Sequence, residues 1–198
     1  MSVNRVLGTN DSDELIYTLE YINSHLEKVE SSTYHWKWIL LAWHSVIQNV
    51  MIHAIDNGDC FRVFLASGNK RIKEIYWETH ENNYDRINKL QLPKFMELYD
   101  GIKNNKLVTH PFPENVDCDR NVRLLNKLRN EFTHYQPHAW VLDVCGCPRL
   151  LLTTAGIIDF YMLNGLHRRW FDEDDEGLFL HQFGIFKNHL VSLQNYYK

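Results

Sequence analysis

Residues 34–56, YHWKWILLAWHSVIQNVMIHAID, decide the fold. The segment is long enough for about six helical turns. Its apolar residues do not keep to one stripe but are spread around almost the whole helical wheel. A helix of that kind is buried at the centre of a bundle. The polar exceptions Lys37, His44 and Gln48 fall near one face by their spacing. We therefore expect an all-α protein built around this helix.

Helical periodicity and capping residues predict further helices on both sides. Residues 59–88 give the weakest signal, with Cys60 to Leu65 compatible with a short strand or a helical turn. Residues 140–144 alternate and predict a short extended segment. The sequence thus predicts an up-and-down helical bundle of about five or six helices in one domain, residues 1–198, with a possible insertion at 59–92. The other expected helices are 11–30, 93–103, 117–135 (or 119–135), 148–170 and 172–196.

Composition limits the classes of function. A chain of 198 residues with 44% hydrophobic and 23% charged residues is typical of one globular domain. A net charge of −4 argues against a strongly basic coat for nucleic acid. RNA remains compatible as a substrate, because an enzyme needs only a local positive patch.

The four cysteines predict neither a zinc site nor a disulfide framework. They include no C-x-x-C pair, and Cys145-Gly146-Cys147 is most simply a turn before Pro148. We interpret the thiols as reduced, which favours the cytoplasm. Residues 1–10 have no apolar signal core, and polar residues interrupt the apolar runs at 39–55 and 150–163. We expect no membrane span, no metal and no cofactor.

The helix predicted at 117–135 has two chemically different faces. On a wheel of about 100° per residue, one side is predominantly apolar and the opposite side is polar. Arg129 lies on the border between them. The apolar side contains Leu124, Leu125, Leu128, Phe132 and Tyr135, and the polar side contains Arg123, Lys127, Asn130 and His134.

The polar side fits RNA cleavage without a metal. A neutral imidazole at His134 can take the proton of a ribose 2′-hydroxyl, and Arg129 can stabilise the charged phosphorane. Asn130 can orient His134 or bind a phosphate oxygen. These three are the candidate catalytic residues. The candidate substrate-binding residues are Arg123, Lys127 and Tyr135.

Arg129-Asn130-x-x-x-His134, in the C-terminal half of a helix, resembles the signature of the HEPN superfamily. Residues 124–135, followed by 140–143, are similar to stand-alone HEPN proteins of bacterial plasmids and defence loci. The segment 38–48 is similar to that group's second helix. The resemblance implies a HEPN-like bundle, usually a homodimer with both motifs at a shared cleft. It also implies an endoribonuclease used as a toxin or in phage defence, with a possible antitoxin partner.

Alternatives remain beside this interpretation. A HEPN subgroup paired with nucleotidyltransferase antitoxins has tyrosine two places after the histidine, whereas this chain has Gln136 there. Regulation by tyrosine adenylylation is therefore in doubt. The same fold also suits a non-catalytic module that binds nucleotide, RNA or protein, or a structural dimer with a solvated polar face.

The remaining histidines and tryptophans favour structural roles. His44 is more often a core histidine than a ligand, although Lys37, His44 and Gln48 would also suit a cleft opposite the motif helix. His35, His44 and His53 alternate sides of their helix and cannot form one site. The tryptophan-rich helix is expected in the core or a dimer interface before it serves as a base-stacking platform.

Overall fold

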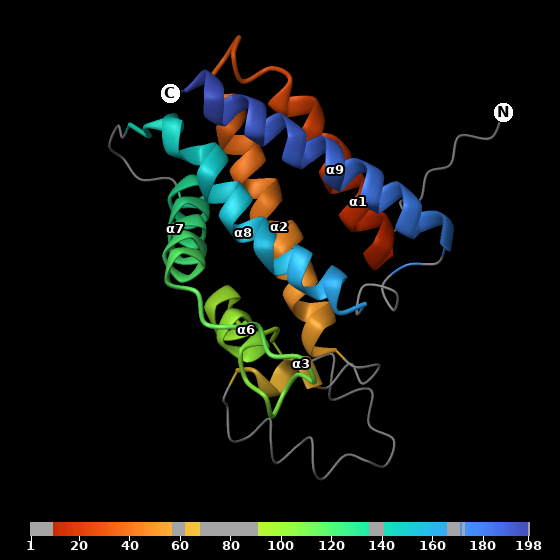
Figure 1. Ribbon diagram of the computed structural model, residues 1–198. Helices are drawn as coiled ribbons and strands as arrows, with labels where there is room; N and C mark the ends of the chain where they lie inside the picture. The colour runs from red at the N-terminus through yellow and green to blue at the C-terminus, as the bar shows by residue number, and fades with distance from the viewer. Residues whose placement is uncertain are drawn as a thin grey trace, which may run out of the picture.

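The computed structural model describes residues 10–56, 62–67, 91–134, 141–165, 171 and 173–197. These residues form helices joined by turns and irregular segments, which confirms the predicted all-α bundle (Figure 1). Six of the described helices have eight residues or more, in agreement with the expected number, and Arg62–Leu65, the described part of the segment that begins at Cys60, form a helical turn. The described helices are α1 (Asp11–Leu26), α2 (His35–Ile55), α3 (Arg62–Leu65), α6 (Phe95–Ile102), α7 (Val116–Thr133), α8 (Cys147–Leu163) and α9 (Glu173–Tyr196).

Helix α2 is the centre of the bundle, as its composition predicts. It packs against α1, α6, α7 and α8, and Figure 1 shows it behind α8 with α7 and α1 on either side. Among the described helices, α2 alone is long and apolar enough to cross a membrane. Its packing inside the bundle accounts for that composition without a membrane. The buried residues of α2 are Trp36, Ile39, Leu40, Trp43, His44, Val46, Ile47, Val50, Met51 and Ile55.

The core is rich in aromatic rings whose polar atoms have partners. Trp43 stacks on Phe186 of α9 with ring centroids 4.3 Å apart, and its Nε1 donates to Thr154 Oγ1 of α8 at 2.8 Å. Trp36 Nε1 donates to the Tyr197 hydroxyl at 3.1 Å. A buried indole needs such a partner for its N–H group. These bonds tie α2 to the C-terminal part of the chain.

Local sequence signals explain most helix ends. Asn10 accepts a hydrogen bond from the Asp13 N–H at the start of α1, and Asn115 does the same for Cys118 at the start of α7. Pro148 lies in the first turn of α8.

Some expected boundaries are wrong. Helix α1 ends at Leu26 instead of residue 30, and buried Val29 lies in the turn that follows. Helix α8 ends at Leu163, followed by Gly165 at a φ of 68°, a backbone conformation that glycine adopts without strain. Residues 141–143 are irregular, and Val144–Gly146 form a 3₁₀ turn before Pro148. Most of the possible insertion at 59–92 lies outside the described residues.

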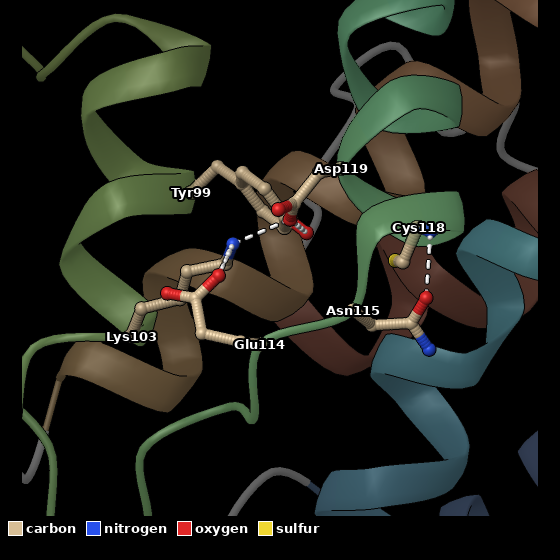
Figure 2. A network of polar contacts seen from close by, with 6 residues as sticks. All are labelled: Tyr99, Lys103, Glu114, Asn115, Cys118 and Asp119. Atoms are coloured by element: carbon tan, nitrogen blue, oxygen red, sulfur yellow. Dashed lines mark hydrogen bonds and ion pairs between the residues drawn. The ribbon is translucent and has the colours of Figure 1, made fainter.

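A polar network joins α6 to the start of α7 (Figure 2). The Tyr99 hydroxyl donates to Asp119 Oδ1 at 2.7 Å, and Lys103 forms ion pairs with Asp119 and with Glu114. Desolvation opposes ionisation of Asp119, but the bonds from Lys103 and Tyr99 prevail and lower the pKa of its carboxyl. The Lys103 ammonium also lies 4.6 Å from the centre of the Tyr99 ring. The network fixes the position of the first turn of α7.

Gly101 permits the close approach of α6 to α2 and α3. A Cβ at this position would lie 2.9 Å from Ile55 Cδ1 and 3.0 Å from Ala66 Cβ. Ile55 is fully buried and has little room to move. We expect Gly101→Ala to lower the free energy of unfolding by about 1–3 kcal/mol in urea titrations, because overpacking is costly.

The matched control is Gly156→Ala in α8. A Cβ there meets nothing within 4 Å. Alanine is favoured over glycine inside a helix, so this variant should be more stable by about 0.5–1 kcal/mol. A Gly101→Ala protein as stable as wild type would contradict the packing described for α6.

Candidate functional site

The motif residues lie on the last two turns of α7, at the edge of the bundle (Figure 1). Arg129 is half-buried, and Asn130 and His134 are exposed. Arg123 and Lys127 are exposed on earlier turns of the same helix. The structure therefore places the predicted polar residues on an accessible face. Tyr135 lies outside the described residues.

The apolar face of α7 differs from the predicted one at Leu124. That side chain is 40% exposed, whereas Val122, Leu125 and Leu128 are buried and Phe132 packs partly against the core. Helices α2, α6 and α8 cover the side of Val122 and Leu125. Leu124 lies about 100° away from Leu125 and extends past this cover.

Asn130 contacts Arg129 directly. Arg129 Nη1 donates to Asn130 Oδ1 at 3.1 Å, which leaves the Asn130 amide N–H groups and the other guanidinium donors available. Within the described ranges no hydrogen bond joins Asn130 to the His134 imidazole. Asn130 is therefore placed to orient the arginine, whereas the sequence predicted a role in orienting His134 or binding a phosphate oxygen.

His134 ends the helix. Its N–H donates to the Asn130 carbonyl at 2.9 Å, but its φ of −98° and ψ of 99° turn the chain away from the helical path. The predicted helix end at Tyr135 is thus two residues too long. Relative to the preceding helix, the direction of Cβ depends on φ and not on ψ, so the Cβ of His134 still lies near the helical position, one turn beyond Asn130.

The positive charge of the polar face is partly compensated. Lys127 Nζ lies 3.7 Å from Glu131 Oε1 in an i,i+4 ion pair. Glu131 was not among the residues predicted for the polar side of the helix. An exposed pair of this kind contributes about 0–1 kcal/mol, so a phosphate can displace the carboxylate at small cost. The face can bind anions but is not strongly cationic.

His44 lies under the motif helix at the contact between α2 and α7. It is 4% exposed, stacks on Phe95 with centroids 3.9 Å apart, and its Nε2 lies 3.3 Å from Asn126 Oδ1. An amide oxygen only accepts, so Nε2 carries the proton. The prediction of a core histidine is confirmed. Its partner Asn126 was missed, although it lies one turn before Asn130.

The His44 imidazole is neutral at physiological pH. Burial is the largest cause that lowers the pKa of His44 to about 4; the positive charge of Arg129 acts in the same direction, and the Asn126 bond opposes it. Arg129 is therefore close enough for its charge to act on the His44 ring. A neutral ring lets the arginine remain there without repulsion.

Lys37 approaches the motif helix from α2. Its ammonium lies 6.0 Å from the Phe132 ring centre, 5.3 Å from Trp38 and 5.8 Å from Tyr34. Phe132 comes two residues before His134. Lys37, His44 and Gln48 were the α2 residues considered for a cleft. Lys37 contacts the end of α7 at Phe132, and His44 contacts its middle at Asn126. A cation held by aromatic rings was not foreseen.

Among the described residues, the other histidines and the cysteines form no comparable centre. His35 Nδ1 lies 2.8 Å from His25 Nδ1 of α1, apart from His44, as the spacing predicted. Cys118, Cys145 and Cys147 are free thiols. In the described part of the chain, no three His, Cys, Asp or Glu residues are grouped to hold a metal ion.

Comparison with protein-family models, curated proteins and solved structures finds no match for this chain. The resemblance to the HEPN superfamily therefore stays a prediction that the motif alone carries.

The depressed pKa of His44 predicts a specific loss of stability in mild acid. Below pH 6.5 the unfolded chain binds a proton at this position, whereas the folded chain does not until about pH 4. The free energy of unfolding therefore falls as the pH drops from 6.5 to about 4. Below pH 4 both states bind the proton, and His44 causes no further loss. One histidine with a pKa of 6.5 in the unfolded chain and about 4 in the folded chain gives a loss of about 2 kcal/mol between pH 7 and pH 5.

Urea unfolding at pH 7 and pH 5 measures this loss. His44→Gln keeps a donor for Asn126 but does not titrate, so the difference between the two pH values should shrink by about that amount. His181→Gln, at an exposed position of α9, should leave the difference unchanged. His25 also has a lowered pKa, through burial and the nearby His35 and Lys28. Its contribution to the pH dependence of stability remains in both variants. An equal pH dependence in wild type and His44→Gln would refute a neutral buried His44.

Proposed function

We propose that the protein is a metal-independent endoribonuclease with its active site at the C-terminal end of α7. The observation that carries the proposal is the placement of Arg129 and His134. Both groups are accessible within two turns, and Asn130 orients the arginine. No other cluster of titratable groups in the described residues offers a base and a phosphate-binding fork on one accessible face.

The residues support transesterification of the RNA backbone. The 2′-oxygen attacks the adjacent phosphorus while His134 takes the 2′ proton. The bond from phosphorus to the 5′-oxygen breaks, and that oxygen takes up a proton from the imidazolium of His134. The products are a 2′,3′-cyclic phosphate and a 5′-hydroxyl. Arg129 stabilises the extra negative charge on the phosphorane through charge-assisted hydrogen bonds.

Substrate binding follows from the same face. Arg123 and Lys127 contact flanking phosphates, with Lys127 exchanging Glu131 for the RNA. In-line attack needs a flexible backbone, which favours single-stranded or looped RNA. Two copies with their α7 ends at one seam would double the local positive charge in a chain of net charge −4. A cytoplasmic homodimer acting as a toxin or in phage defence, with or without an antitoxin, is the corresponding biological role.

A second candidate is a non-catalytic module that binds RNA, nucleotide or a protein through the same face. The Lys127–Glu131 pair favours it, because a satisfied surface pair needs no substrate. The absence of a hydrogen bond to the His134 imidazole among the described residues also favours it. Such a module would bind RNA without turnover and would be harmless on overexpression.

Cleavage of RNA in EDTA tests the proposal. We expect wild type to cut a single-stranded RNA and to leave cyclic phosphate ends. His134→Ala should lower the rate about 10²–10⁴-fold by removing the proton acceptor. Arg129→Ala should lower it about 10²–10³-fold by removing charge stabilisation.

His181→Ala is the matched control, since it removes an exposed histidine from α9. It should cut at the wild-type rate. Loss of cleavage in His134→Ala and Arg129→Ala but not in His181→Ala, with all proteins purified alike, excludes a contaminating nuclease. Cleavage that persists in His134→Ala would remove the mechanism. RNA binding without any cleavage by wild type would favour the non-catalytic module.

A further inference from the structure

Trp38 differs from the other described tryptophans of α2. Trp36 and Trp43 are buried and their indole N–H groups are bonded within the core. Trp38 is 39% exposed, meets the edge of exposed Tyr34 with centroids 6.4 Å apart, and has the Lys37 ammonium 5.3 Å from its ring centre. The ring is thus available to a ligand, and its exposure has no role in the packing of the bundle.

A positive charge accompanies this ring. The Lys37 ammonium lies within 6.0 Å of the rings of Tyr34, Trp38 and Phe132. Phe132 belongs to the last turn of α7, beside the motif. This aromatic surface of three rings and the ammonium therefore links the start of α2 to the last turn of α7, the turn that ends just before His134.

A groove extends this surface between α1 and α2. It has a volume of about 330 Å³ and is lined by residues of both helices. Ala42 on its α2 wall follows Trp38 by one turn, so the groove continues the exposed face of Trp38. Tyr17 and Tyr21 on its α1 wall are exposed aromatic side chains. The lining residues are Glu14, Tyr17, Thr18, Tyr21, Ala42 and Ser45.

We propose that this aromatic surface, with Tyr34 and Trp38 at its centre, binds unpaired bases of single-stranded RNA while Lys37 neutralises a phosphate. The inference rests on the proposed ribonuclease and assigns its substrate class. Bases stacked on aromatic rings beside cations are the common mode of single-strand binding, and stacking requires bases that are not paired.

Charge favours RNA over a second copy of the chain as the occupant. Lysine is depleted from the cores of protein interfaces. Here a lysine stands at the centre of the surface, and Arg129 lies on the adjoining α7. A polyanion with flat bases complements both features, whereas a second copy would bring the same positive charges to the contact.

Binding to a labelled oligonucleotide tests the proposal separately from cleavage. The probe is a fluorescein-labelled 12-nucleotide oligo(U) or oligo(A), read by anisotropy in EDTA, with His134→Ala as the parent protein. Added Trp38→Ala should weaken binding about 5- to 100-fold, the range for loss of one stacked base. Trp38→Phe should retain affinity within about threefold, because the ring remains.

Two further variants separate stacking from general effects. Tyr196→Ala removes an exposed aromatic ring from α9 and should bind like the parent. Lys37→Met should flatten the dependence of log affinity on log salt by about 0.7, the value for one phosphate contact on a single strand. A duplex of the same length should compete poorly. Circular dichroism and thermal unfolding verify that each variant is folded.

Several results would overturn the proposal. These are an affinity in the Trp38→Ala variant equal to that of the parent, a parent that does not bind the oligonucleotide, or a duplex that binds equally well. Sedimentation that shows Trp38→Ala breaking a dimer, with affinity per chain unchanged, would assign the surface to a second copy. Base binding that depends on Trp38, without cleavage by wild type, would remove the ribonuclease and keep the binding site. A cleavage rate that is unchanged by Trp38→Ala would remove the binding site and keep the ribonuclease.

Discussion

The burial of α2 is the constraint on which the rest of the structure depends. Helices α1, α6, α7 and α8 pack against it, and Trp43 also stacks on Phe186 of α9. Within α2 only Trp38 and Ser45 are exposed, and Ala42 lines the groove beside them. Two polar contacts fix the rotation of α2: Trp43 bonds to α8 and His44 meets α7. Because an unsatisfied buried donor is costly, a rotated α2 would lose both contacts along with its packing. The position of α7 and the exposure of Trp38 follow from the same rotation.

Helix α7 is held firmly at its start and loosely at its end. Asp119 is tied to Tyr99 and Lys103, and the middle is fixed by buried Leu125 and Leu128. After Leu128 only Phe132 packs against the core, and it does so partly. Arg129 stands at this transition, with a partly covered stem and a guanidinium turned toward Asn130. A group that binds phosphate needs this combination of fixed position and accessible donors.

The sequence was sufficient for the helices and for the exposure of the motif, because both follow from periodicity along one segment. It was insufficient wherever the answer depends on which neighbour covers a residue. Leu124 fits an apolar stripe, but no described helix covers it. Trp38 and Trp36 are the same residue type two positions apart, and only the packing of α2 makes one exposed and the other buried. The His44–Asn126 contact joins residues 82 positions apart, which no local pattern encodes.

Electrostatics connects the motif with the aromatic surface. A chain of net charge −4 attracts RNA weakly at long range, and Glu131 already compensates Lys127. Phosphate contacts alone would therefore give modest affinity that falls quickly with salt. The proposed stacking on Trp38 and Tyr34 would add affinity that depends less on salt and that excludes paired bases. In the proposed ribonuclease, an active site with few free cations would gain selectivity for single strands from its neighbouring rings, and the acidic remainder of the surface would limit adsorption to duplex RNA.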